Sequence, residues 1–316
     1  MSSPGIQTQS KIQPRSRWSQ TLDRGFIWLT RIFALAVAAT LIWIAIEVVI
    51  EATPAIMQFG AGFLTSTAWN PVTEEYGVLP MIYGTVVSSA IALLIAVPVG
   101  VGVSLFLSED YLPPKLQLPL VFLVELLAAI PSVVYGLWGI FVLGPLLVNL
   151  VQPLSTYFGW LPIFSPPVSN RSMLTAGVIL SIMILPTIAA ISRDALISLH
   201  SDLRQAAVGL GATRWETILK VLLPAAFSGI VSAVMLALGR AIGETMAVTM
   251  VIGNSNNISP SLLAPSNTIP SLLANQFAEA SGLQVASLMY AALILFVITL
   301  VVNILAQLVV SRVQRI

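Results

Sequence analysis

Two oppositely charged residues stand four positions apart inside a long apolar segment of this chain. They are Arg240 and Glu244, in the stretch LALGRAIGETMAV. A charge at the centre of a membrane helix costs about 2.5–3.5 kcal/mol even on the lenient insertion scale, and arginine keeps its charge at any realistic pH. Its planar guanidinium presents several N–H donors that fit the oxygens of phosphate or carboxylate. We therefore expect Arg240 to contact a small oxyanion within the membrane.

Glu244 limits which oxyanions we expect to contact Arg240. On a continuous helix a residue four positions on shares the helix face, so we expect Glu244 beside Arg240. A carboxylate there repels a fully ionised dianion such as sulfate, yet it accepts a hydrogen bond from a remaining P–OH group of phosphate. The pattern favours phosphate, with Glu244 orienting Arg240 or taking the phosphate proton. The competing interpretation is an ion pair that only holds helices together. Glu125, in an earlier apolar segment, is a further candidate for the substrate path, although a structural hydrogen bond is the simpler interpretation for it.

The composition places the chain in lipid. Of its 316 residues, 57% are hydrophobic and 9% are charged, and the mean hydropathy is +0.94. Soluble domains carry about 25% charged residues, so a chain with this little charge needs a solvent other than water. The chain has no cysteine and one histidine, His200, which excludes disulfides, thiolate metal sites and a histidine metal cluster. We expect neither a bound metal nor a catalytic residue.

Long apolar runs predict an all-α membrane protein with about six transmembrane helices, because about 20 apolar residues cross the hydrocarbon core as a helix. The predicted spans are residues 26–50, 81–107, 118–147, 173–192, 225–253 and 285–310. Lysine and arginine gather on the side that holds both termini and the loop 193–224, so we expect these parts to be cytoplasmic. The expected organisation is a flexible basic tail over 1–25, a first helix with an outer loop over 26–80, and a core domain over 81–312.

The loop 193–224 carries the sequence RQAAVGLGATRWETILKVLLP at its end. The pattern predicts two short amphipathic helices joined by a glycine turn. Such a helix–turn–helix knob fits a groove on a partner protein, whereas the simpler alternative is a loop that lies on the lipid surface. The residues expected to dock on the partner are Gln205, Ala206, Ala207, Gly211, Trp215, Leu223 and Pro224.

The same loop resembles the EAA loop by which ABC-importer permeases bind their ATPase. It has Gln205 where that loop usually has glutamate, while Gly211 and the pair Leu223 and Pro224 match. The segments GRAIGETMAV, AVPVGVGVSLFLSEDY and AAIPSVVYGLWG also resemble the PstC-type permease subunits of the bacterial high-affinity phosphate importer. The likeness covers most of residues 79–312.

The resemblance implies a type I permease fold, a cell-membrane location and a non-catalytic role in transport, with Arg240 and Glu244 functional. The implied partners are a PstA-type permease, an ATPase dimer on the cytoplasmic face and an external phosphate-binding protein. The chain has no G-x-x-x-x-G-K-[ST] loop, so we expect ATP and Mg²⁺ on the ATPase partner and no cofactor on this chain. One alternative is a permease for sulfate or molybdate. Another is a channel or secondary transporter that works alone, which gains no support because no internal repeat is visible.

Overall fold

The computed structural model describes residues 17–109 and 111–313. It divides the chain into two units, residues 1–50 and 51–316. The first unit contains most of one long helix, α1 (Arg17–Phe59), whose apolar side chains are exposed nearly throughout. The helix begins earlier than the predicted residue 26, so residues 17–25 are helical and not a flexible tail; residues 1–16 of that predicted tail lie outside the described residues.

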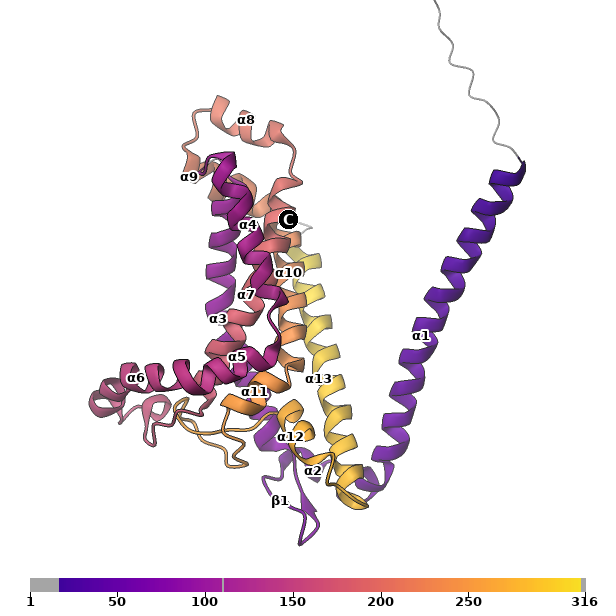
Figure 1. The fold of residues 1–316 in the computed structure, drawn as a ribbon, viewed down its shortest axis with the longest axis vertical. Coiled ribbons are helices and arrows are strands. Elements are labelled where there is room, and N and C mark those ends of the chain that lie inside the picture. Colours follow the sequence, from indigo (N-terminus) through magenta and orange to yellow (C-terminus); the bar gives the residue numbers. More distant parts are fainter. Residues whose placement is uncertain (1–16, 110, 314–316) are drawn as a thin grey trace, which may run out of the picture. The chain divides into compact units, whose positions relative to one another are not determined.

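The second unit is a helical bundle with one small hairpin (Figure 1). Its elements in chain order are α2 (Gly62–Thr65), β1 (Trp69–Asn70), β2 (Glu75–Tyr76), α3 (Leu79–Ser108), α4 (Pro114–Ala129), α5 (Ser132–Trp138), the π-helical turn η1 (Gly139–Leu143), α6 (Gly144–Phe158), the 3-10 turn η2 (Pro162–Phe164), α7 (Met173–Ile197), α8 (Ser201–Gly209), α9 (Arg214–Thr217), the π-helical turn η3 (Ile218–Leu222), α10 (Leu223–Gly243), α11 (Met246–Val251), α12 (Ile269–Gln276) and α13 (Leu283–Val313).

Six helical segments of the described residues are long and apolar enough to cross a membrane. They are Leu22–Phe59, Leu79–Ser108, Ser132–Phe158, Met173–Ile197, Arg214–Gly243 and Leu283–Leu308. The predicted helical fold class is therefore confirmed, although two of the predicted spans are wrong as continuous helices.

The third predicted span, residues 118–147, is broken in its middle. Helix α4 ends at Ala129, and Ile130 takes an extended conformation with φ −66° and ψ 127°. The next residue is Pro131, whose ring disfavours a helical conformation at the residue before it. After this break the chain runs through α5 and η1 into α6, which projects sideways from the bundle (Figure 1).

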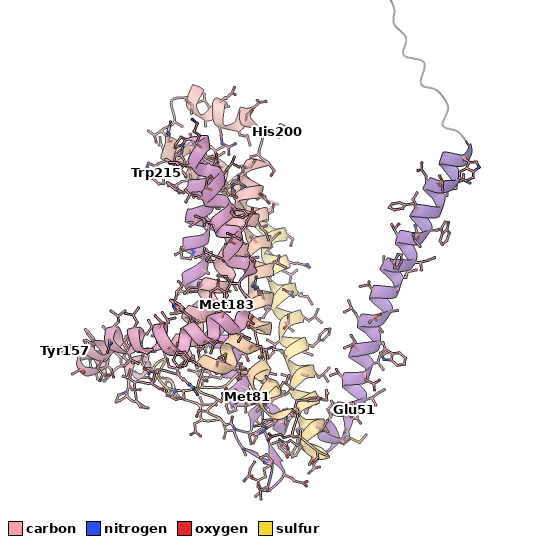
Figure 2. All side chains as sticks on the ribbon, in the orientation of Figure 1. Glu51, Met81, Tyr157, Met183, His200 and Trp215 are labelled. Carbon is pink, nitrogen blue, oxygen red and sulfur yellow. The ribbon has the colours of Figure 1, made fainter. Side chains whose placement is uncertain are left out.

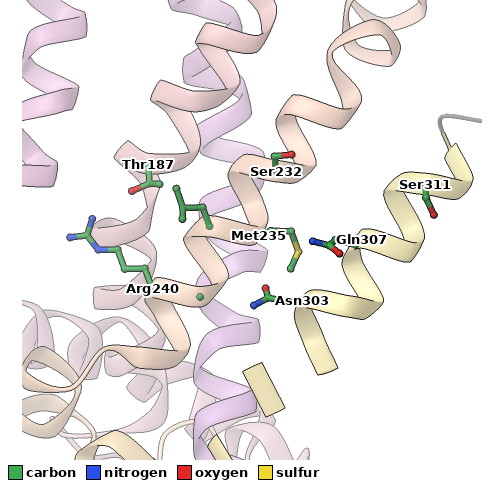
Figure 3. A pocket seen from close by; sticks show the side chains of 9 residues that line it. Thr187, Ser232, Met235, Arg240, Asn303, Gln307 and Ser311 are labelled. Carbon is green, nitrogen blue, oxygen red and sulfur yellow. The ribbon is translucent and has the colours of Figure 1, made fainter. Parts of the chain in front are cut away.

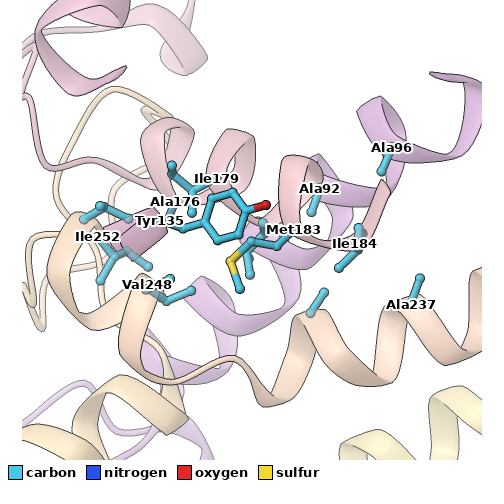
Figure 4. Close-up of a cluster of buried hydrophobic side chains, with 14 of the residues drawn as sticks. Ala92, Ala96, Tyr135, Ala176, Ile179, Met183, Ile184, Ala237, Val248 and Ile252 are labelled. Carbon is cyan, nitrogen blue, oxygen red and sulfur yellow. The ribbon is translucent and has the colours of Figure 1, made fainter. Parts of the chain in front are cut away.

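The core forms where small residues let α3 and α7 approach closely. A Cβ atom added at Gly177 of α7 would lie 2.5 Å from a side-chain carbon of Ile91 on α3, and one at Gly100 of α3 would lie 2.8 Å from Ile188 on α7. Small residues at such contacts bring membrane helices together. The same core includes Tyr135 of α5, and Figure 4 shows its ring among side chains of α7 and α11.

A second cluster of buried side chains closes the end of the bundle that carries the hairpin. Trp69 of β1 pairs with Tyr76 of β2 in an antiparallel register. Phe63 and Met81 are fully buried there against residues of α12 and α13. The loop over residues 51–80, which the sequence grouped with the first helix, therefore packs on the core.

Candidate functional site

Arg240 lies in the last turn of α10 and lines a cavity of about 790 Å³. We call this cavity the groove. It is bounded by α7, α10 and α13 and lined by Thr187, Ser232, Met235, Leu236, Gly239, Arg240, Asn303, Gln307 and Ser311. Arg240 is the one charged residue among these described lining residues, so the groove has a cationic point within otherwise neutral walls.

The groove crosses one face of α10. Its α10 residues recur at helical spacing from Ser232 to Arg240, which places them on one side of that helix. In Figure 3, Arg240 and Thr187 lie to one side of α10, whereas Asn303 and Gln307 lie on the other side, on α13. The polar side chains therefore flank a common space from three different helices.

Arg240 has no partner of its own in the described part of the chain. It makes neither a hydrogen bond nor an ion pair with any described residue, and its side chain is partly exposed. A guanidinium within a membrane bundle is costly unless water, an anion or a dipole stabilises it. The C-terminal end of α10 supplies a favourable dipole, and the open groove leaves room for an anion.

Glu244 does not share a helix face with Arg240, and that prediction is wrong. Helix α10 ends at Gly243, and Glu244 has extended backbone with φ −67° and ψ 122°. Its Oε1 atom accepts a hydrogen bond of 3.2 Å from the backbone N–H of Ala247, at the start of α11. Each charge therefore lies at the helix end whose dipole it complements, Arg240 at a C-terminus and Glu244 at an N-terminus, which is how both are tolerated without pairing.

Glu125 lies apart from the groove. It is exposed on α4 and lines a separate, small pocket with Arg193 and Asp194 of α7. Of the three residues expected along the substrate path, the structure therefore brings only Arg240 into the groove.

Residues 193–224, which we call the docking loop for their predicted role, run from the last turns of α7 to the start of α10 and contain the predicted pair of short helices, α8 and α9. Helix α8 ends at Gly209, and Gly211 then turns the chain with φ +85°, a conformation that residues with a Cβ rarely adopt. Thr213 begins α9 with a capping box: the Glu216 N–H donates to Thr213 Oγ1 at 3.3 Å, and the Thr213 N–H donates to Glu216 Oε2 at 3.1 Å. The turn and the cap together fix the angle between α8 and α9.

The tip of this loop exposes large apolar side chains. Leu210 is 90% exposed and Trp215 is 65% exposed, and Figure 2 shows Trp215 and His200 at the end of the bundle opposite Met81. Gln205 and Ala206 are exposed as well, whereas Ala207, on the same helix α8, is buried. An apolar tip held by a stiff turn suits insertion into a partner.

Leu223 and Pro224 join this tip to a membrane span. Pro224 lies in the first turn of α10, and helical structure precedes it as η3. The Leu223 N–H donates to the carbonyl of Ile218, which closes a wide π-helical turn. This turn directly precedes Pro224, which has no backbone N–H to donate within the helix. The docking loop is thus continuous with α10, the helix that carries Arg240.

The neutral polar residues of the groove were not predicted from the sequence. Asn303, Gln307 and Ser311 recur every four residues along the second half of α13, a helix that is mostly apolar. That spacing is visible in the sequence, but the residues predicted for the substrate path were all charged, so these neutral residues were left out. The approach of Thr187 on α7 to the same space was not visible, since it depends on how the helices pack.

These features are those of a membrane permease: six possible spans among the described residues, a groove with a cationic residue between them, and an exposed apolar tip on a loop between two spans. The family described as "binding-protein-dependent transport system inner membrane component" matches residues 96–315. The chain is 48% identical to the phosphate transport system permease protein PstC of Mesorhizobium japonicum, over 92% of this chain and 91% of that protein. It is 44% identical to the protein of the same name from Haemophilus influenzae, over 98% of each. The chain belongs to this family of permease components and is of the PstC type.

Solved structures agree on the fold. A bacterial ABC transporter that imports alginate is similar with a TM-score of 0.57 at 19% identity, over 94% of this chain and 99% of that chain. The MetNI methionine ABC transporter is similar with a TM-score of 0.53 at 19% identity, over 75% of this chain and 94% of that chain. The chain therefore has the type I permease fold. It is an inner-membrane, non-catalytic transport component of a family that works with an ATPase and an external binding protein.

Proposed function

We propose that this chain is the membrane subunit that carries inorganic phosphate in an ATP-driven importer. The observation that carries the proposal is Arg240, a permanent cation without a protein partner among the described residues, which lines an open groove in the bundle. The names of the relatives support phosphate as its cargo. In this role the guanidinium binds phosphate oxygens in place of the water that the anion leaves behind.

The groove is half of a passage in this proposal. Its walls come from α7, α10 and α13, and a second permease of the PstA type covers its open side. A closed passage keeps the anion away from lipid and leaves Arg240 as the strongest attraction along its length. An external phosphate-binding protein delivers the anion at the end that carries the hairpin.

The docking loop transmits movement of the ATPase dimer to the membrane helices. The apolar tip around Leu210 and Trp215 inserts into a groove on the ATPase, which binds ATP and Mg²⁺. Because η3 continues directly into α10, movement of the tip moves the helix that carries Arg240. ATP binding and hydrolysis thereby alternate the side from which the groove is open.

Anion competition tests the cargo. The chain is purified with its partner permease, ATPase and binding protein, reconstituted in liposomes, and supplied with labelled phosphate and ATP. Uptake that depends on ATP and is competed by unlabelled phosphate, but not by sulfate or molybdate, supports the proposal. Uptake competed equally by sulfate or molybdate assigns the chain to another oxyanion, and ATP-independent uptake by this chain alone overturns the proposed role.

A further inference from the structure

Two side-chain amides in the groove have no hydrogen-bond partner within the described part of the chain. Neither Asn303 nor Gln307 makes a hydrogen bond with a described residue. The two serine hydroxyls of the groove behave differently: Ser232 Oγ donates to the carbonyl of Ser228 at 2.8 Å, and Ser311 Oγ donates to that of Leu308 at 3.0 Å. The amides, unlike these hydroxyls, keep their donors available in the groove.

The positions of the two amides show in which direction the polar residues of the groove continue from Arg240. Asn303 and Gln307 lie one helical turn apart on the groove face of α13 (Figure 3). The line continues to Ser311, close to the end of α13. On the facing helix, Ser232 precedes Arg240 and lies nearer the docking loop. From Arg240 the polar residues therefore lead along α13 toward the end of the bundle that carries α8 and α9.

The chemistry of the amides differs from that of Arg240 in one respect. Each amide donates N–H groups to an oxyanion and so replaces part of its hydration, but it carries no charge. Conduction requires sites that bind strongly enough to admit an ion and weakly enough to release it. A neutral site after a cationic one meets that requirement, and no acidic residue is among the described residues that line the groove.

We propose that Asn303 and Gln307 form a second, neutral oxyanion subsite on the inner side of Arg240, which receives phosphate as Arg240 releases it. This inference rests on the proposed function and adds a step to it. Arg240 attracts the anion into the groove, and the two amides support it between that cation and the cytoplasmic mouth. The amides set the rate of release rather than the affinity for delivered phosphate.

The test replaces the amides by apolar groups of similar shape in the complete transporter. The variants are Asn303→Leu, Gln307→Met and the double change, with Leu308→Met as the control because Leu308 is 56% exposed and does not line the groove. The maximal rate of labelled phosphate uptake should fall at least about tenfold in the double variant, the scale of one hydrogen bond to a charged group. The concentration of loaded binding protein that gives half-maximal uptake should not change, and the control should transport normally.

A second variant distinguishes a subsite from a packing contact. Gln307→Arg keeps a donor but adds a charge, so it should retain labelled phosphate on the purified complex and slow its release. Wild-type uptake by the double apolar variant, while Arg240→Gln still abolishes uptake, overturns the subsite and leaves the proposed function intact. Failure of the double variant to co-purify with the second permease also overturns it, since the amides are then contacts between subunits. Normal uptake by Arg240→Gln instead overturns the proposed function itself.

Discussion

Arg204 of α8 donates two hydrogen bonds to a single carboxylate oxygen of Glu109, the residue that follows α3. Its Nε atom lies 3.2 Å and its Nη2 atom 2.9 Å from Glu109 Oε1. The same Nη2 atom also donates to the carbonyl of Leu196 on α7, at 3.1 Å. Both side chains are largely shielded, with 28% of Arg204 and 16% of Glu109 exposed. One arginine thus ties the docking loop to the ends of two central spans.

Loss of this ion pair should impair the coupling of ATP hydrolysis to transport rather than the binding of the ATPase. Glu109→Gln removes the charge that holds α8, while the apolar tip of the loop keeps its ability to bind the ATPase. We expect normal co-purification with the ATPase but fewer phosphate ions transported per ATP hydrolysed. The double change Glu109→Arg with Arg204→Glu should restore part of that ratio. An unchanged ratio in Glu109→Gln would show that the pair does not transmit movement.

Two neighbouring glycines allow a matched test of the turn between α8 and α9. A Cβ atom has open space at both Gly209 and Gly211, but only Gly211 has a positive φ, of +85°. Gly211→Ala should therefore strain the turn by about 1–2 kcal/mol and weaken binding of the ATPase. Gly209→Ala should have little effect. Titration of the purified complex with its ATPase measures both, and equal affinities for the two variants would contradict the role given to this turn.

Trp215 should anchor the ATPase. Large exposed aromatic residues dominate many interfaces, so Trp215→Ala should cost about 2 kcal/mol of binding free energy, close to a thirtyfold loss of affinity. Trp160, which is 76% exposed in the segment after α6, is the control. Trp160→Ala should leave ATPase affinity unchanged in the same titration. A similar loss in both variants would indicate a general defect of the membrane domain.

Glu244 gives a prediction about selectivity. In Glu244→Gln the amide oxygen still accepts the hydrogen bond from the Ala247 N–H, so the start of α11 should be preserved. Although Glu244 does not line the groove, its negative charge stands four residues after Arg240, and the substitution removes its repulsion of a fully ionised dianion such as sulfate near that arginine. We expect slower phosphate uptake and increased inhibition of that uptake by sulfate. Inhibition by sulfate at the wild-type level would remove Glu244 from the account of selectivity.

The sequence predicted the features that depend on local pattern. Apolar runs located the spans, and glycine marked the turn of the docking loop, whereas the cap at Thr213 was not predicted. The breaks after Ala129 and Gly243 were missed because each lies inside a run that stays apolar on both sides. Pro131 was a visible signal for the first break. Gly243 was the corresponding signal for the second.

Features that depend on how the helices pack could not be predicted from the sequence. Glu109 and Arg204 are far apart in the chain, and only the approach of α8 to the ends of α3 and α7 brings them together. The separation of Glu125 from Arg240 has the same cause, because it depends on which face α4 turns toward α7. The charge on Arg240 marked that residue as a candidate from the sequence, whereas the groove that it lines and the neutral polar residues there were not predicted.

The most direct test of the account compares one substitution at two arginines. Arg240→Gln and Arg171→Gln each remove one guanidinium, but Arg171 is exposed in the loop before α7 and does not line the groove. Both variants are assembled with the partner permease, the ATPase and the binding protein, and ATP-driven uptake of labelled phosphate is measured in liposomes. If Arg240 binds phosphate during transport, the Arg240→Gln complex should assemble but lose uptake, while Arg171→Gln should transport normally. Full uptake by an assembled Arg240→Gln complex would contradict it.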